Sequence, residues 1–267
     1  MQIVGADGRE AGEPTDEAII RQHDDIRAKI AEEHPLVSPL APIRDLLTRE
    51  TRNNVVSKIN ELDDRYDGIR RVRGDGNCFF RSYLLAVFTR IAGDQDKFAT
   101  VLDNLIARIE SSKAELIEAG FPDFAVEDFW DEFRSQLHNL KDSRPTPSQV
   151  EETFADQSVS DYLVMYARLL TSWYLQTNAD QFQPYIQDYP SIEKFVKAEV
   201  EPMGKEADHL HCLALASCLG VGVQIEYLDH NPGPISHVTF PEDSTKTPIA
   251  FVLYRPGHYD ALQPKSQ

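Results

Sequence analysis

The sequence predicts an α+β protein that is mostly helical, with a small β-sheet formed largely by the C-terminal part of the chain. Helical periodicity dominates as far as residue 218, and from residue 221 short apolar or alternating runs typical of strands replace it. Because the helices precede the strands, we expect the helices to lie on one side of the sheet. The chain has 267 residues, 41% of them hydrophobic, which is enough to bury a large core.

Composition excludes several classes of protein. The 27 lysines and arginines against 44 aspartates and glutamates give a formal charge of -17, which disfavours nucleic acid and permits a protein partner with a basic face. No apolar run approaches the roughly 20 residues of a membrane span, and no apolar segment near Met1 resembles a secretory signal. Three cysteines, an odd and sparse set, favour reduced thiols. We therefore expect a protein of the cytoplasm or nucleus.

The first 36 residues are expected to form an N-terminal arm, followed by one domain over residues 37–267. A helix is predicted over residues 15–34, because Thr15 can cap it and Pro35 stops it. Its apolar stripe is thin and consists of Ile19, Ile26 and Ile30. Such a stripe suits either a loosely docked terminal helix or an arm that binds a partner.

The remaining elements follow from periodicity and from turn residues. The predicted helices cover residues 43–62, a segment that opens at Cys78, and residues 98–117, 124–140, 162–175 and 207–218. The segment 162–175 is apolar nearly all round, with Ser160 or Asp161 available to cap it, which predicts a helix at the centre of the core. The predicted strands cover residues 68–73, 221–228, 237–240, 249–254 and 258–262.

The turn Gly74-Asp75-Gly76-Asn77 delivers a cysteine to the first turn of a helix. At that position the thiol of Cys78 meets unpaired N–H groups and the positive end of the helix dipole, which favour the reactive thiolate. The same N–H groups can stabilise the oxyanion that forms when a thiolate attacks a carbonyl. The alternative is that Cys78 is a small buried hydrophobic residue after an ordinary turn.

A second candidate segment is Tyr254-Arg255-Pro256-Gly257-His258-Tyr259-Asp260. In an extended chain His258 and Asp260 face the same side, so the carboxylate can orient the imidazole and leave its other nitrogen free to take a thiol proton. Such a pair also occurs as a structural hydrogen bond.

Nothing in the sequence predicts a metal or another cofactor. His209, His211 and Cys212 lie close together, but the two histidines fall on different faces of a helix and no second ligand pair follows. Cys212 and Cys218 are therefore expected in the core.

Together, segments 75–81 and 254–260 resemble the active site of the ovarian-tumour-domain (OTU) cysteine deubiquitinases, and most closely that of the otubain branch. Segments 156–158, 160–163 and 200–203, with Asp208-His209, extend the resemblance over about residues 19–262. It implies a papain-like OTU cysteine protease fold and hydrolysis of ubiquitin isopeptide bonds. In the implied roles Cys78 is the nucleophile, His258 the general base and acid, Asp260 the group that orients the ring, and Asp75 part of the oxyanion loop.

The otubain resemblance also implies partners. It implies ubiquitin chains linked through lysine forty-eight, with the N-terminal helix on the proximal ubiquitin and a monomeric enzyme. The residues that would lie near the distal ubiquitin are Phe182, Tyr185, Ile186 and His209, although core packing explains these aromatic residues equally well.

Two alternative functions remain. Some otubains bind ubiquitin-charged conjugating enzymes without cleaving them, through a surface that resembles residues 121–129 here, although Pro122, Asp123 and Ala125 depart from that pattern. The catalytic residues alone would also fit a thiol protease or transferase with an unrelated substrate.

Overall fold

The computed structural model describes residues 34–50, 52–242 and 247–265. The chain divides into two units, Met1–Pro35 and Leu36–Gln267. Apart from His34, the predicted arm helix lies outside the described residues, and with it Ile19, Ile26 and Ile30. The second unit begins one residue before the predicted boundary because Leu36 is already buried in the core.

The elements of the second unit confirm an α+β class in which helices come first and most strands last. The helices are η1 (Ile43–Arg49), α2 (Asn53–Arg65), α3 (Cys78–Gly93), α4 (Gln95–Glu118), α5 (Asp123–Asp142), α6 (Pro147–Ala155), α7 (Gln157–Thr177), α8 (Ala179–Phe182), η2 (Gln183–Tyr185), α9 (Ile192–Phe195), η3 (Val196–Val200) and α10 (His209–Leu219). The strands are β1 (Tyr66–Arg70), β2 (Val223–Tyr227), β3 (Ser236–Phe240), β4 (Ala250–Arg255) and β5 (His258–Pro264). No helix in the described part of the chain combines the length and apolar character that crossing a bilayer requires.

Within the described residues the strands form one sheet of order β1-β5-β4-β2-β3. Strands β2 and β4 are parallel and the other neighbouring pairs are antiparallel. Strand β1 comes from the first third of the chain and pairs with β5, the last strand. This long-range pairing brings the segment that leads into Cys78 beside the strand that carries His258.

The sheet separates two apolar clusters, because side chains alternate between its faces. On one face Val252 and Ala261 join the main core, which contains the inner side of α3. On the other face Leu253 and Leu262 join a smaller cluster with residues of η1 and α2. Both faces are thus covered by helices, whereas the sequence predicted helices on one side only.

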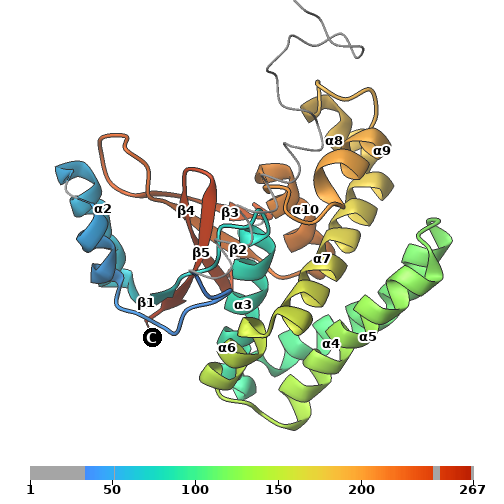
Figure 1. Ribbon diagram of the computed structural model, residues 1–267, viewed down its shortest axis with the longest axis horizontal. Helices are drawn as coiled ribbons and strands as arrows, with labels where there is room; N and C mark the ends of the chain where they lie inside the picture. The colour runs from blue at the N-terminus through green and yellow to red at the C-terminus, as the bar shows by residue number, and fades with distance from the viewer. Residues whose placement is uncertain (1–33, 51, 243–246, 266–267) are drawn as a thin grey trace, which may run out of the picture. The chain divides into compact units, whose positions relative to one another are not determined.

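Helix α3 positions the candidate nucleophile at the centre of the fold. It packs against β4 and β5 on one side and against α6 and α7 on the other (Figure 1). Nearly every side chain from Cys78 to Ile91 is buried, so the helix is held all round. A helix fixed in this way holds its first residue in a defined place.

The predicted helix over residues 43–62 is wrong in one respect, because the structure divides it into η1 and α2. Glu50 and Arg52 both adopt extended backbone angles between the two helices. In a continuous helix with roughly 100° per residue, the inward-facing Ile59 would point roughly 160° away from Ile43. The break lets both parts pack on the same face of the sheet.

The predicted core helix 162–175 is confirmed as α7, but it begins earlier. Its N-cap is Asp156, whose carboxylate accepts the Ser158 N–H at 2.9 Å. The predicted caps Ser160 and Asp161 contact an arginine of α3 instead. The helix also buries a charged residue, Arg168, whose side chain is fully inaccessible.

Candidate active site

The turn before α3 forces Cys78 into the first helical position. Gly76 has a φ of +80°, and a Cβ atom there would lie 2.0 Å from the carbonyl oxygen of Gly204. Only glycine fits this combination of a left-handed backbone and a close approach. Asn77 is the N-cap, Cys78 follows as the first residue of α3, and only 4% of Cys78 is exposed.

His258 and Asp260 lie on β5 and face the same side, as the sequence predicted. The Nε2 atom of His258 lies 2.9 Å from Oδ1 of Asp260. Cys78 lies near enough to the ring to interact with it and to favour its protonated form. Because Nε2 is engaged, Nδ1 is the nitrogen available to the thiol, and the lack of a side chain at Gly74 keeps the space beside Nδ1 open.

Asp260 is fully buried and its carboxylate is held on both oxygens. Oδ1 also accepts the backbone N–H of Val72 at 2.9 Å, and Oδ2 accepts Nη2 of Arg255 at 2.6 Å. Burial by itself would raise the pKa of Asp260, but the hydrogen bond and charge of His258, with Arg255 and the Val72 N–H, lower it. The carboxylate is therefore a fixed anion behind the imidazole.

The same contacts favour the protonated imidazole. Burial of the ring opposes protonation of His258, but its hydrogen bonds and charge interactions with Asp260 and Cys78 outweigh burial and raise its pKa from 6.5 to about 9. At neutral pH the ring is therefore expected to carry a proton that it can give to a leaving group. The arrangement fits a thiolate and imidazolium pair that an aspartate orients.

Asp75 supports the turn through its side chain. Its Oδ1 accepts the N–H of Asn77 at 2.9 Å, and its own N–H donates to the carbonyl of Arg73 at 3.1 Å. Among the described residues, the N–H groups of Gly76 and Cys78 have no protein acceptor. These two donors are available to an oxyanion, and the carboxylate of Asp75 shapes the turn that presents them.

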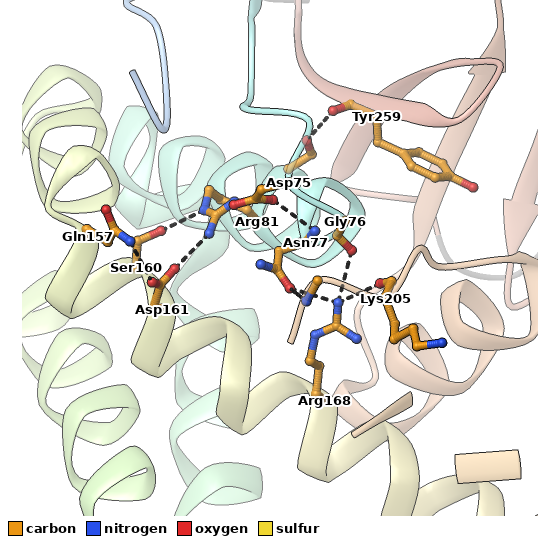
Figure 2. Close-up of polar contacts among 12 residues, drawn as sticks. Asp75, Gly76, Asn77, Arg81, Gln157, Ser160, Asp161, Arg168, Lys205 and Tyr259 are labelled. Carbon is orange, nitrogen blue, oxygen red and sulfur yellow. Dashed lines mark hydrogen bonds and ion pairs between the residues drawn. The ribbon is translucent and has the colours of Figure 1, made fainter. Parts of the chain in front are cut away.

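Two buried arginines, to which the sequence reasoning gave no role, hold this turn in place (Figure 2). Arg81 donates to both oxygens of Asp75 and to Ser160 and Asp161 at the start of α7. Arg168 donates to the carbonyl of Gly76 and to the side chain of Asn77. The signal that could have revealed Arg168 is its charge in the middle of an otherwise apolar helix, since such residues are rarely buried without a function or a partner.

The four residues predicted near the distal ubiquitin differ in how exposed they are. Phe182 and Ile186 are 3% and 4% exposed and belong to a packed cluster beside α7, which leaves them almost no surface for a docked protein. Tyr185 is 72% exposed, and His209 is exposed at the start of α10 with its ring beside Tyr227. Core packing therefore accounts for two of the four in this structure.

The remaining histidine and cysteines have structural partners. His211 completes a capping box with Asp208, the N-cap of α10. Cys212 and Cys218 are buried free thiols, as predicted. The described residues contain no group of three side chains that could hold a metal ion.

A thiol at a helix N-terminus, paired with an imidazole on a neighbouring strand and an aspartate behind it, defines the class of thiol peptidases. The family profile of peptidase C65, otubain, matches residues 29–264. The chain therefore belongs to the otubain family of cysteine deubiquitinases.

Relatives and solved structures agree with this assignment. The rat protein named ubiquitin thioesterase OTUB1 is 39% identical over 251 residues, covering 92% of this chain and 90% of its own. The Arabidopsis thaliana ovarian tumor domain-containing deubiquitinating enzyme 1 is 36% identical over 251 residues, covering 86% and 81%. A structure of h/ceOTUB1 with ubiquitin aldehyde and UBCH5B~Ub has a TM-score of 0.86 at 35% identity, covering 94% of this chain and 98% of that one.

Proposed function

We propose that this enzyme hydrolyses the isopeptide bonds of ubiquitin chains and prefers chains linked through lysine forty-eight. The arrangement of Cys78, His258 and Asp260 carries the proposal, because it brings together a nucleophile, an acid and base, and an orienting carboxylate. Ubiquitin as the substrate is supported by the relatives named ubiquitin thioesterase. All three groups come from one chain, so we expect a monomer to be active.

The reaction follows from these positions. The Cys78 thiolate attacks the isopeptide carbonyl carbon, and the oxyanion accepts hydrogen bonds from the N–H groups of Gly76 and Cys78. As the C–N bond breaks, protonated His258 gives its Nδ1 proton to the departing lysine amine, and a thioester with Cys78 remains. Water then loses a proton to the neutral imidazole and adds to the thioester. When the C–S bond breaks, it releases the ubiquitin carboxyl group and restores the thiolate and imidazolium pair.

The linkage preference and the role of the arm rest on the otubain family. In this proposal the helix predicted over residues 15–34 contacts the proximal ubiquitin through Ile19, Ile26 and Ile30, and the exposed Tyr185 and His209 contact the distal one. Three free cysteines, one of them the nucleophile, suit a reducing compartment. We therefore place the enzyme in the cytoplasm or nucleus.

The test is gel-based cleavage of every linkage type of diubiquitin by the wild type, Cys78→Ala and a chain that lacks residues 1–35. This deletion ends where the second unit begins, so it leaves Leu36 and its core contacts intact. We expect the lysine-forty-eight-linked dimer to disappear fastest, Cys78→Ala to be inactive, and the shortened chain to show a raised KM. Failure of folded wild-type enzyme to cleave any dimer would refute the proposal.

A second candidate function is inhibition of ubiquitin-charged conjugating enzymes without cleavage. The solved structures with TM-scores of 0.86 contain UBCH5B~Ub or UBC13~Ub, and Phe124, in the segment predicted for this contact, is 79% exposed on α5. If this function is present, Cys78→Ala should still suppress chain synthesis in a reconstituted ubiquitination assay, and Phe124→Ser should relieve the suppression. Equal suppression by Cys78→Ala with and without Phe124→Ser would exclude Phe124 from this contact.

A further inference from the structure

The guanidinium of Arg168 lies directly beneath the turn that precedes the nucleophile (Figure 2). Its Nη2 donates to the carbonyl of Gly76 at 3.0 Å, to Oδ1 of Asn77 at 2.8 Å and to the carbonyl of Lys205 at 2.7 Å. Its Nη1 donates to the carbonyl of Val200 at 2.8 Å. One side chain thus joins the catalytic turn to the segment at residues 200–205.

Arg168 differs from the neighbouring Arg81 in how its charge is balanced. Arg81 forms ion pairs with Asp75 and Asp161, whereas all four acceptors of Arg168 are neutral oxygens. Burial lowers the pKa of Arg168 to about 10, so the group still carries its charge at neutral pH. The ring of Phe80, 4.4 Å from the guanidinium carbon, covers the cation.

Burying a cation such as Arg168 costs free energy. Its hydrogen bonds show which part of the chain it holds in place. The carbonyl of Gly76 fixes the plane of the peptide between Gly76 and Asn77. That peptide lies between the N–H groups of Gly76 and Cys78, the two donors available to an oxyanion. Anchoring this peptide helps to hold in place the turn that carries both donors.

Asn77 links the turn to the segment at residues 200–205. Its Oδ1 accepts hydrogen bonds from both Arg168 and the N–H of Gly204, at 2.8 Å and 2.9 Å. The approach of Gly204 to Gly76 is so close that no side chain fits between them. The turn is therefore clamped between α7 and residues 200–205, with the guanidinium at the junction.

We propose that Arg168 is a positioning residue for the hydrolysis: it holds the turn at Gly76 and Asn77 so that the N–H groups of Gly76 and Cys78 face the oxyanion. This inference rests on the proposed function, because it assigns a role in the same isopeptide hydrolysis. Arg168 touches neither substrate nor reacting atoms. Its effect should therefore be much larger in a reaction that forms an oxyanion than in one that does not.

Two reactions of Cys78 separate this role from a general structural one. Hydrolysis of lysine-forty-eight-linked diubiquitin forms an oxyanion. Alkylation by iodoacetamide does not, because the thiolate forms a C–S bond at an sp³ carbon while the C–I bond breaks and iodide leaves. Mass spectrometry of the peptide that contains Cys78 measures the alkylation rate apart from Cys212 and Cys218. Both rates are measured for the wild type, Arg168→Met and Arg168→Lys.

We expect Arg168→Met to lower kcat about 100-fold with little change in KM, which is the order of loss seen when oxyanion donors are removed or misplaced. The alkylation rate should fall far less than kcat, because alkylation loses only the charge interaction of Arg168 with Cys78. Arg168→Lys keeps the charge but cannot reach four acceptors with one ammonium, so it should recover only part of the loss. The matched control is Arg108→Met, since Arg108 also donates to a backbone carbonyl and lies over a ring, that of Trp173, but contacts Cys218 and Glu115 instead of the turn.

The outcomes distinguish this inference from the proposed function. An inactive wild type would refute the proposed function. An active wild type with an equally active Arg168→Met would refute the inference alone, as would parallel losses of hydrolysis and alkylation. If Arg168→Met does not fold, Asn77→Ala removes one acceptor and leaves the three carbonyls, and it should lower kcat about tenfold with unchanged alkylation. Wild-type kcat in folded Asn77→Ala would then overturn the inference.

Discussion

Replacing Asp260 by asparagine should disable the enzyme by changing the protonation of His258. Asp260 is fully buried and accepts three hydrogen bonds, from His258, Val72 and Arg255. An asparagine side chain has one accepting oxygen and one donating NH₂ group, so it cannot accept from donors on both sides. At least one of the three bonds is lost, and the anion that favours the imidazolium disappears.

The size of the effect follows from the raised pKa of His258. The rise from 6.5 to about 9 corresponds to about 3 kcal/mol, because a tenfold change in a protonation equilibrium is worth about 1.4 kcal/mol. Since the folded value lies above the unfolded one, this stabilisation is complete below about pH 6.5 and is lost as the pH rises through about 9. Without Asp260, only Cys78 opposes the burial of the ring, and we expect the pKa of His258 to fall.

Two measurements test this reasoning. The free energy of unfolding of Asp260→Asn should be lower than that of the wild type by about 3 kcal/mol or more at pH 6. The gap should be smaller at pH 10, where the lost ion pair with Arg255 still contributes. The value of kcat/KM for diubiquitin should fall about 1,000-fold or more, because the ring loses its orientation and its proton. Equal stability gaps at pH 6 and pH 10, together with an unchanged alkaline limb of activity, would refute the reasoning.

Two further predictions concern the turn and the back of the sheet. Gly76→Ala should cost about 3 kcal/mol or more and abolish activity, because its Cβ would overlap the Gly204 carbonyl. Gly120→Ala, also at positive φ but with open space around it, should lower the free energy of unfolding by only about 1 kcal/mol. Glu226→Ala should cost about 2 kcal/mol, because it leaves the guanidinium of Arg65 and the hydroxyl of Tyr66 without their acceptor. Because Glu226 lies on the face of the sheet away from α3, kcat of this variant should be unchanged. A large loss of kcat would contradict this reasoning.

Local patterns predicted much of the candidate site. The glycines around Asp75 predict a turn, and the helix after it places Cys78 at its start. The alternation of a strand puts His258 and Asp260 on one side. Each of these inferences concerns residues that are near neighbours in the chain, where backbone geometry leaves few choices. The meeting of Cys78 with His258 is different, because 179 intervening residues must fold before the two side chains come together.

The parts that the sequence reasoning misjudged or left open are those that depend on distant packing. Residues 43–62 have a helical pattern throughout, but the chain breaks at Glu50 so that two short helices can share one face of the sheet. Phe182 and Ile186 could be surface or core by pattern alone, and the neighbouring helices bury them. Hydrophobicity shows that a side chain favours burial, but only the fold shows whether a partner surface covers it.

The sequence by itself predicted the class of the protein, the order of its main elements, the candidate nucleophile and the pair on the last strand, since these follow from periodicity, turn chemistry and motifs. Only the tertiary structure decided how the nucleophile is supported. It supplies the Val72 N–H and the Arg255 cation to Asp260, and the guanidinium of Arg168 to the turn. The physical reason is that a buried polar group must find its partners wherever the fold places them, and these partners lie up to 188 positions apart in the chain.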